Sequence, residues 1–162
     1  MAAHETTIRE AEDWLQSIFS ALGADYGERF SGLGLILYYP RLALPVLPLA
    51  RSAPALPLPT RNLQESIRLL QELCRFDSVF HDGFHLVDAE SLTITHVSQF
   101  FSPPIPDIVP ELMTDHPIGA RFMSAWLGSN LPAVCMTATL SRSEGGLVFA
   151  RGVVRTLFTP GK

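Results

Sequence analysis

Apolar residues recur along the chain with two different spacings, one typical of helices and one typical of strands. Residues 6–23 carry apolar side chains at helical spacing, with Thr7 and Glu10 placed as a capping box and a glycine where the pattern stops. The spacing therefore predicts an amphipathic helix over 6–23. A second amphipathic helix is predicted over 61–74, with Asn62 as its N-cap.

Short apolar runs without helical spacing predict β-strands. The run LGLILYY at 33–39 is continuous, as in a strand that is buried on both faces. Strands at 83–88 and 92–97 are separated by the turn residues DAES, which predicts a hairpin. Further strands are predicted toward the C-terminus, at 132–140, 146–152 and 153–158.

The order of these elements indicates the fold class. Residues 40–59 are rich in proline and predict an irregular surface loop, and 102–110 predicts another, with room for one helical turn. A third helix is predicted over 116–128, with Pro117 suited to its first turn. The whole predicts an α/β fold, a mixed central sheet flanked by helices, formed by 1–162 as a single domain.

Composition narrows the class of protein. The formal net charge is −4, which gives no general attraction to nucleic acid or to an anionic membrane surface. The start MAAHETTIREAEDW is too polar for a signal peptide, and prolines interrupt the most apolar stretch. We therefore expect a cytoplasmic protein with no membrane segment. Cys74 and Cys135 lie in apolar surroundings and are expected to be buried, reduced thiols.

The histidines only weakly suggest a metal site. His81 and His85 lie close to Asp82, but the chain there turns into a strand, where residues four apart do not converge. A zinc site on these side chains is the minor alternative. The chain has no cysteine pair at zinc spacing, no G-x-S-x-G elbow and neither of the common phosphate-binding glycine loops.

Two glycine-bearing turns could carry chemistry. PIGAR places Gly119 and Arg121 in the first turn of a predicted helix, where free amides, the positive dipole end and a guanidinium suit a phosphate. The alternative is a glycine needed for packing beside a solvated arginine. The turn SRSEGG at 141–146 is, by itself, typical of a simple hairpin.

Three segments, taken in this order, make the chain resemble the diadenylate cyclase (DAC) domain superfamily, which joins two ATP molecules into cyclic di-AMP. The first is FHDGF, which keeps His81, Asp82 and Gly83 of the family's Leu-His-Asp-Gly-Ala turn before a strand. The likeness covers roughly residues 5–160. In the family, this aspartate helps to hold the metal and activates a ribose 3′-hydroxyl, so the resemblance implies that role for Asp82 if the chain is active.

The other two segments match less closely. GARFM keeps Gly119 and Arg121 of the family's Gly-Thr-Arg-His-Arg segment, and Ser129 falls at a matching serine further along. SRSEG keeps Ser141 and Gly145 of the family's Ser-Glu-Glu-Thr-Gly turn. The resemblance therefore implies that Asp82 and Arg121 lie near each other, across one concave site at the edge of the sheet.

The departures from the family concern the phosphates. Phe122 and Met123 replace the His and the second Arg of the family's phosphate-contacting segment, and Phe84 replaces its Ala. Two lost charge-assisted hydrogen bonds would cost on the order of 3 to 6 kcal/mol if the losses add. Efficient ATP cyclisation is thus not expected. Phe84 could instead stack on a base, a contact worth about 1 to 3 kcal/mol.

The resemblance therefore implies a nucleotide-binding domain, a sensor or regulatory module with impaired catalysis and no cofactor. Its ligand would be ATP, AMP or a cyclic dinucleotide, with no nucleic acid and no membrane as partner. One alternative is an active diadenylate cyclase with Mg²⁺ or Mn²⁺ at Asp82, to be expected as a homo-oligomer because the family's catalysis needs two domains face to face. Another is an interaction scaffold that has lost its ligand. The implied nucleotide-binding residues are His81, Gly83, Phe84, Gly119, Arg121, Ser129, Ser141 and Gly145.

Overall fold

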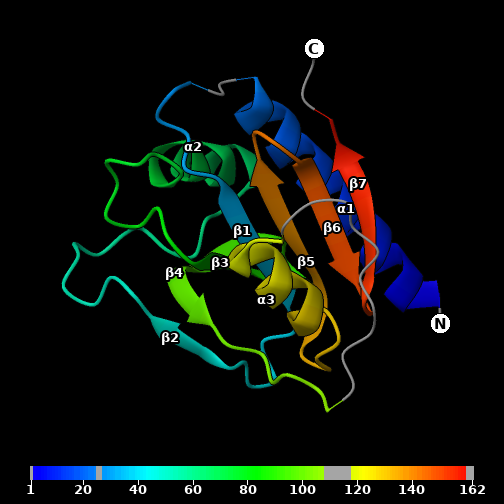
Figure 1. Ribbon diagram of the computed structural model, residues 1–162. Coiled ribbons are helices and arrows are strands. Elements are labelled where there is room, and N and C mark those ends of the chain that lie inside the picture. The colour runs from blue at the N-terminus through cyan, green and yellow to red at the C-terminus, as the bar shows by residue number, and fades with distance from the viewer. Residues whose placement is uncertain (1, 25–26, 108–117, 160–162) are drawn as a thin grey trace.

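The described part of the chain forms one mixed sheet with helices on both faces, which confirms the predicted fold class (Figure 1). The computed structural model describes residues 2–24, 27–107 and 118–159. The strand order is β2-β4-β3-β1-β5-β6-β7, and only β1 and β3 pair in parallel among the strand pairs described. The helices are α1 (Ala2–Gly23), α2 (Leu63–Leu73) and α3 (Ala120–Gly128). The strands are β1 (Leu33–Tyr38), β2 (Val46–Pro48), β3 (Phe84–Asp88), β4 (Thr93–Phe101), β5 (Val134–Ser141), β6 (Gly145–Ala150) and β7 (Val153–Phe158).

The central strand β1 is buried on both faces, as its continuous apolar run predicted. Leu35 and Leu37 belong to the apolar cluster that includes residues of α1 and α2. Ile36 belongs to a second cluster, which includes residues of α3. Successive side chains of a strand point to opposite faces, so α1 and α2 cover one face and α3 covers the other. Figure 1 shows α3 in front of the sheet and α1 behind it.

The first helix is longer than predicted. It begins at Ala2, so Thr7 lies inside the helix and the predicted capping box is wrong. The predicted apolar stripe is buried, and its residues are Ala11, Trp14, Leu15, Ile18, Phe19 and Leu22, with Ile8 partly buried. Gly23 is the last helical residue, where a Cβ atom would lie only 2.4 Å from Cζ of Phe158. Glycine therefore lets the end of β7 approach the end of α1.

The proline-rich segment contains a short edge strand, so the prediction of an irregular loop over 40–59 is wrong at 46–48. β2 pairs antiparallel with β4, with Val46 opposite Phe101. An edge strand tolerates Pro48 because one side of its backbone needs no ladder partner. β4 also runs past its predicted end at residue 97, since its last residues pair with β2.

Some sequence expectations fall on parts of the chain that the structure does not describe. Pro117 lies outside the described residues, as does part of the loop predicted over 102–110, whose described residues 102–107 contain no helix. Within the described ranges, no helix has both the length and the apolar character that crossing a bilayer requires. Cys74 and Cys135 are buried free thiols, as predicted, and burial raises the pKa of Cys74 to about 12.

The N-cap of α2 gives a direct test of the local sequence signals. Asn62 Oδ1 accepts the backbone N–H of Glu65 at 3.0 Å, as the sequence predicted. We expect Asn62→Ala to lower the free energy of unfolding by about 1 kcal/mol, the usual cost of a lost N-cap. Urea denaturation measures it. Gln64→Ala, a change at an exposed position of the same helix, is the matched control and should stay within about 0.5 kcal/mol of the parent. Equal effects of the two changes would contradict the capping role.

Candidate functional site

Two of the segments singled out in the sequence, the Asp82 turn and the SRSEGG turn, meet at one edge of the sheet. β1 and β3 are parallel, with Leu35 opposite His85, so both strands begin at this edge. β5 runs antiparallel to β1, with Leu33 opposite Leu140, so β5 ends there and the turn into β6 follows. The Asp82 turn, the residues before β1 and the turn after β5 are therefore neighbours in space.

Asp82 serves its own turn and also faces Arg121. Its Oδ1 accepts the backbone N–H of Gly83 at 2.7 Å, and the same oxygen lies 3.9 Å from Nη2 of Arg121. Gly83 has a φ of +77°, and a Cβ atom there would lie 2.5 Å from the backbone oxygen of Gln99, so this turn requires glycine. The predicted proximity of Asp82 and Arg121 is confirmed, while their roles stay predictions.

Arg121 lies in the first turn of α3 and extends toward the sheet edge. The N-cap of this helix, Gly119, makes no side-chain capping hydrogen bond. A Cβ atom at Gly119 would meet no described atom within 4 Å, so packing does not explain the glycine. The Arg121 side chain is 29% exposed, and its Nη1 donates a long hydrogen bond of 3.5 Å to the carbonyl oxygen of Ser31. A partly desolvated cation thus lies beside the start of a helix.

Ser31 and Gly32 form the seat of this guanidinium, and neither was among the residues predicted for the site. Gly32 has a φ of +94°, and a Cβ atom there would lie 2.6 Å from Nη1 of Arg121 and 3.3 Å from the backbone oxygen of Leu140. The backbone conformation therefore requires glycine, and a side chain here would displace the end of the Arg121 side chain. The only signal in the sequence is the glycine directly before the apolar run of β1.

The turn between β5 and β6 borders this seat. Ser141 is paired with Gly145 across the turn, and its Oγ accepts the backbone N–H of Glu144 at 3.1 Å. Gly145 has a φ of +74°. These contacts are those of a hairpin turn, while the adjoining carbonyl of Leu140 lies against Gly32. The position of the segment is thus compatible with both interpretations, a simple hairpin turn and a border of the candidate site.

Ser129 lies away from the other predicted site residues. It caps the C-terminal end of α3, whereas Arg121 lies at the N-terminal end. Its side chain is buried, donates to the carbonyl of Trp126 at 2.7 Å and accepts the N–H of Gly152 at 3.0 Å. The serine therefore fastens the end of α3 to the turn between β6 and β7, and the structure does not bring it to the nucleotide site that was predicted.

Phe84 is a core residue. It is 4% exposed, and its ring packs edge-on against Phe101 at a centroid distance of 5.4 Å. The ring also lies so close to Gly34 that a Cβ atom on that residue would be only 2.8 Å from it. A ring packed in this way presents no free face to a base. The predicted stacking role is therefore corrected, because the alternation of β3 directs this side chain into the cluster beneath α3.

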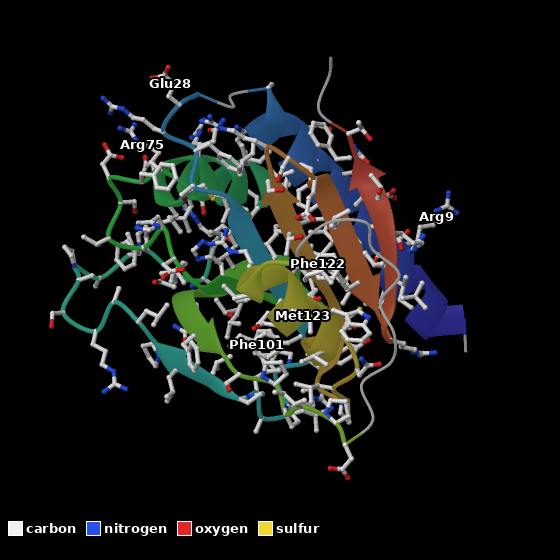
Figure 2. The ribbon with its side chains drawn as sticks, viewed as in Figure 1. Arg9, Glu28, Arg75, Phe101, Phe122 and Met123 are labelled. Atoms are coloured by element: carbon white, nitrogen blue, oxygen red, sulfur yellow. The ribbon has the colours of Figure 1, made fainter. Side chains whose placement is uncertain are left out.

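Phe122 also belongs to the core beneath α3. It is 7% exposed and meets Phe149 edge to face at 4.9 Å, while Met123 is half-buried against the same cluster. Figure 2 shows both side chains on α3, with Phe101 close by. A histidine at position 122 would bury a polar ring among apolar side chains, which costs free energy unless it finds a hydrogen bond. Phe122 is thus a packing residue of α3.

The two histidines near Asp82 have different surroundings. His81 is half-buried, and its ring lies 6.1 Å from that of Phe76. His85 is buried, and its Nδ1 accepts the backbone N–H of Ser98 at 3.1 Å. Burial, and then the charge of Arg121, lowers the pKa of His85 to about 3, so the ring is neutral with its proton on Nε2.

The described residues do not fit a divalent cation. Among residues 2–24, 27–107 and 118–159, no group of three His, Cys, Asp or Glu side chains converges to hold a metal. Asp82 is a single carboxylate, with one oxygen already bonded to its own turn and close to a guanidinium. Magnesium and manganese prefer several oxygen ligands, and Asp82 supplies too few for either ion. The zinc alternative finds no support in this part of the chain either.

Comparison with known proteins supports the fold. Neither a known protein family nor a curated protein sequence matches the chain. A hypothetical membrane-spanning protein from Bacillus cereus is similar in structure, with a TM-score of 0.62, 16% identity, and coverage of 94% of this chain and 64% of that one. A double mutant of the diadenylate cyclase DacA from Staphylococcus aureus gives a TM-score of 0.56 and 16% identity, covering 94% and 91%.

These likenesses show a fold like that of the diadenylate cyclase domain, as the resemblance in the sequence implied. The chain spans less than two thirds of the Bacillus cereus protein and most of DacA. At this level of identity the similarity shows the fold alone.

The buried His85 makes stability depend on pH in a predictable direction. The unfolded chain binds a proton near the ordinary pKa of 6.5, whereas the folded chain resists it down to about 3. Stability should therefore fall as the pH drops through this window, by up to about 1.4 kcal/mol per pH unit. His85→Gln keeps an acceptor for the Ser98 N–H but does not titrate, so its stability should fall less steeply. Urea unfolding at several pH values compares the slopes.

His96→Gln is the matched control, because it removes an exposed imidazole from the neighbouring strand. Its slope should follow that of the parent. If His85→Gln keeps the parent's slope in full, the imidazole is not held neutral by burial.

Proposed function

We propose that this domain binds a nucleotide through its phosphate at the sheet edge formed by Asp82, Arg121 and the backbone of residues 31–32, and that it acts as a sensor or regulatory module. The observation that carries the proposal is the environment of the Arg121 guanidinium. Its side chain is 29% exposed, and within the described ranges the guanidinium lies 3.9 Å from Asp82 and donates a long hydrogen bond to the Ser31 carbonyl. Such a cation, already partly desolvated, gains more from an anion than a fully solvated one would.

The start of α3 adds a second attraction for a phosphate. Arg121 follows an N-cap without a side-chain capping bond, and the first amides of a helix have no partner within the helix itself. These amides and the positive end of the helix dipole favour a phosphate placed there. The open space around Gly119 is consistent with a ligand group close to the backbone.

The same surroundings argue against a triphosphate with its metal. Phe122 faces the core and Met123 is half-buried, so neither supplies a donor to a phosphate. Among the described residues, Asp82 has no companion ligands for a cation. A ligand with less phosphate charge, such as AMP or a cyclic dinucleotide, makes smaller demands on this site. The fold supports a nucleotide as the ligand class only by analogy with DacA.

An active diadenylate cyclase is the second candidate, and one observation favours it. The Asp82 side chain is 76% exposed at the mouth of β3, so its carboxylate remains accessible to a ribose hydroxyl. In that case the missing ligands would have to come from residues outside the described part or from a second copy of the domain. A measurement of turnover separates the two candidates, and failure to bind any nucleotide would favour a scaffold.

Loss of the Arg121 side chain tests the proposed site. We expect Arg121→Ala to weaken nucleotide binding by about 1.5 to 3 kcal/mol, the range for a charge-assisted contact. The fold should survive, because the polar partners of the guanidinium among the described residues are Asp82, at 3.9 Å, and the Ser31 carbonyl, at 3.5 Å, and both contacts are long. Calorimetric titration with ATP, AMP and cyclic di-AMP gives the affinities, and melting curves check the fold.

Arg9→Ala is the matched control, since Arg9 is exposed on α1, which covers the face of the sheet opposite to α3. It should leave nucleotide binding unchanged. A well-folded Arg121→Ala protein with the parent's affinity would count against the site.

We expect little or no synthesis of cyclic di-AMP from ATP, because the phosphate-facing donors are lost and the described residues offer no metal site. Incubation of the purified protein with ATP and either magnesium or manganese, followed by mass spectrometry, measures the product. Multiple turnover that disappears in Asp82→Asn would establish the second candidate instead.

A further inference from the structure

Phe76 is an exposed aromatic residue in the connector between α2 and β3, which leads into the Asp82 turn. It is 62% exposed, so most of its surface is open to solvent. A single exposed apolar side chain is common on protein surfaces, and exposure alone carries no conclusion. The position of Phe76 relative to Arg121 is what distinguishes it.

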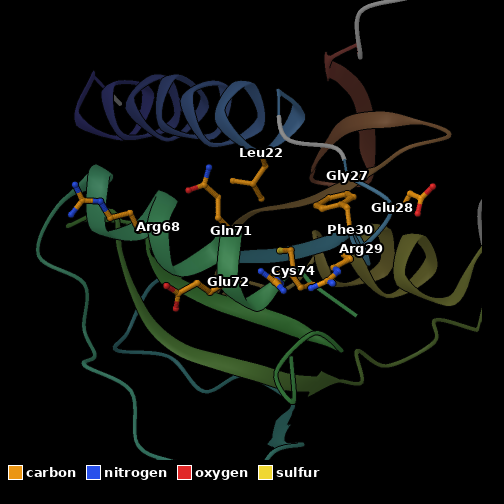
Figure 3. Close-up of a pocket in the computed structure, with 10 residues that line it drawn as sticks. Leu22, Gly27, Glu28, Arg29, Phe30, Arg68, Gln71, Glu72 and Cys74 are labelled. Atoms are coloured by element: carbon orange, nitrogen blue, oxygen red, sulfur yellow. The ribbon is translucent and has the colours of Figure 1, made fainter. Parts of the chain in front are cut away.

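The backbone of Phe76 is held beside the seat of Arg121. The N–H of Phe76 donates to the carbonyl of Arg29 at 2.9 Å, and the N–H of Ser31 donates to the carbonyl of Cys74 at 2.7 Å. Figure 3 shows Arg29 next to Cys74, where these two antiparallel segments meet. The carbonyl of Ser31 also accepts the Arg121 guanidinium. Arg29 and Ser31 are two residues apart, at most about 7 Å of chain, so Phe76 and the guanidinium lie on one short ladder.

A second series of contacts leads from the ring of Phe76 to Arg121. The ring lies 6.1 Å from that of His81, with an angle of 62° between the ring planes. His81 directly precedes Asp82, whose carboxylate lies 3.9 Å from the guanidinium. The backbone ladder and the side chains thus form a closed circuit of contacts. The aromatic pair and the cation therefore border the same small area at the sheet edge.

The connector is anchored around Phe76. The carboxylate of Asp77 accepts from Arg75 at 2.9 Å and from Arg29 at 3.3 Å. The N–H of Ser78 donates to the carbonyl of Arg75 at 2.9 Å, which closes a turn directly after Phe76. The ring is therefore presented from a fixed backbone, and a ligand that stacks on it loses little entropy in ordering this segment.

We propose that Phe76 is the base-binding residue of the nucleotide site: its ring stacks on the base while Arg121 holds the phosphate. This inference rests on the proposed function and names the residue that recognises the second half of the ligand. Phe84, expected to stack from the sequence, is buried, whereas Phe76 has the exposed ring that stacking requires. Every base has an aromatic face, so Phe76 favours nucleotides over sugar phosphates without selecting one base.

A comparison of AMP with ribose 5-phosphate measures the contribution of the base, because the two ligands share the sugar and the phosphate. Calorimetric titration should show AMP binding at least about fivefold more tightly. Phe76→Ala should weaken AMP binding by at least about fivefold and leave ribose 5-phosphate binding unchanged. Val153→Ala is the control, since it removes an exposed apolar side chain at the start of β7, and it should change neither affinity.

Phe76→Trp keeps an aromatic face at this position and reports on contact directly. It should bind AMP at least as tightly as the parent, because the stacking surface is retained. The fluorescence of the added indole should be quenched by AMP and not by ribose 5-phosphate. The parent protein, which contains Trp14 and Trp126, supplies the background signal.

The outcomes separate the role of Phe76 from the proposed function. Equal binding of AMP and ribose 5-phosphate, or an unchanged AMP affinity in Phe76→Ala, would overturn the role of Phe76. If Arg121→Ala then still weakens both ligands, the phosphate site stands and the base lies elsewhere. If neither ligand binds to the parent protein, the proposed function fails together with the role of Phe76. Melting curves check that Phe76→Ala is folded, as its exposed position predicts.

Discussion

The parallel pairing of β1 with β3 is the constraint on which the candidate site depends. Parallel strands begin at the same edge of a sheet, so the turn before β3 and the residues before β1 must lie side by side. The antiparallel partner β5 brings its own end to that edge. Both faces of β1 have to be covered for this arrangement to be stable, which the helices do from opposite sides. The segment SRSEGG by itself predicts a simple turn, and this geometry places that turn beside Asp82 and the residues before β1.

The contact between Arg121 and Gly32 shows how two elements on different faces of the sheet are joined at the edge. The arginine belongs to α3, yet its guanidinium reaches the chain that enters β1, where any side chain would occupy its place. Within the described part of the chain the guanidinium thus lies beside the start of β1 without a close ion pair, since Asp82 is 3.9 Å away and largely exposed. A charge that is positioned but weakly neutralised is the electrostatic condition for recognising an anion.

The sequence predicted helices and strands well where neighbouring residues in the chain determine them. Asn62 caps α2 through its own side chain, and the run of β1 is apolar because both faces are buried. β2 was missed because three residues paired across an edge leave no periodic pattern. Asp82 and Arg121 were recognised by resemblance, and their proximity follows from the fold. Ser31 and Gly32 could not be found in this way, since their role depends on the distant Arg121 side chain, a tertiary contact that leaves no local mark.

The attachment of α3 at its far end has a consequence for how such a domain can change over time. Ser129 and Trp126 tie the C-terminal turn of α3 to the hairpin between β6 and β7, with the Trp126 indole donating to the Gly152 carbonyl at 2.8 Å. Polar contacts therefore fasten the end of the helix that does not face the candidate site, while Phe122 packs its start into the core. Substitutions at exposed positions of the first turn would leave these fastenings intact, so the two ends of α3 are under different structural constraints.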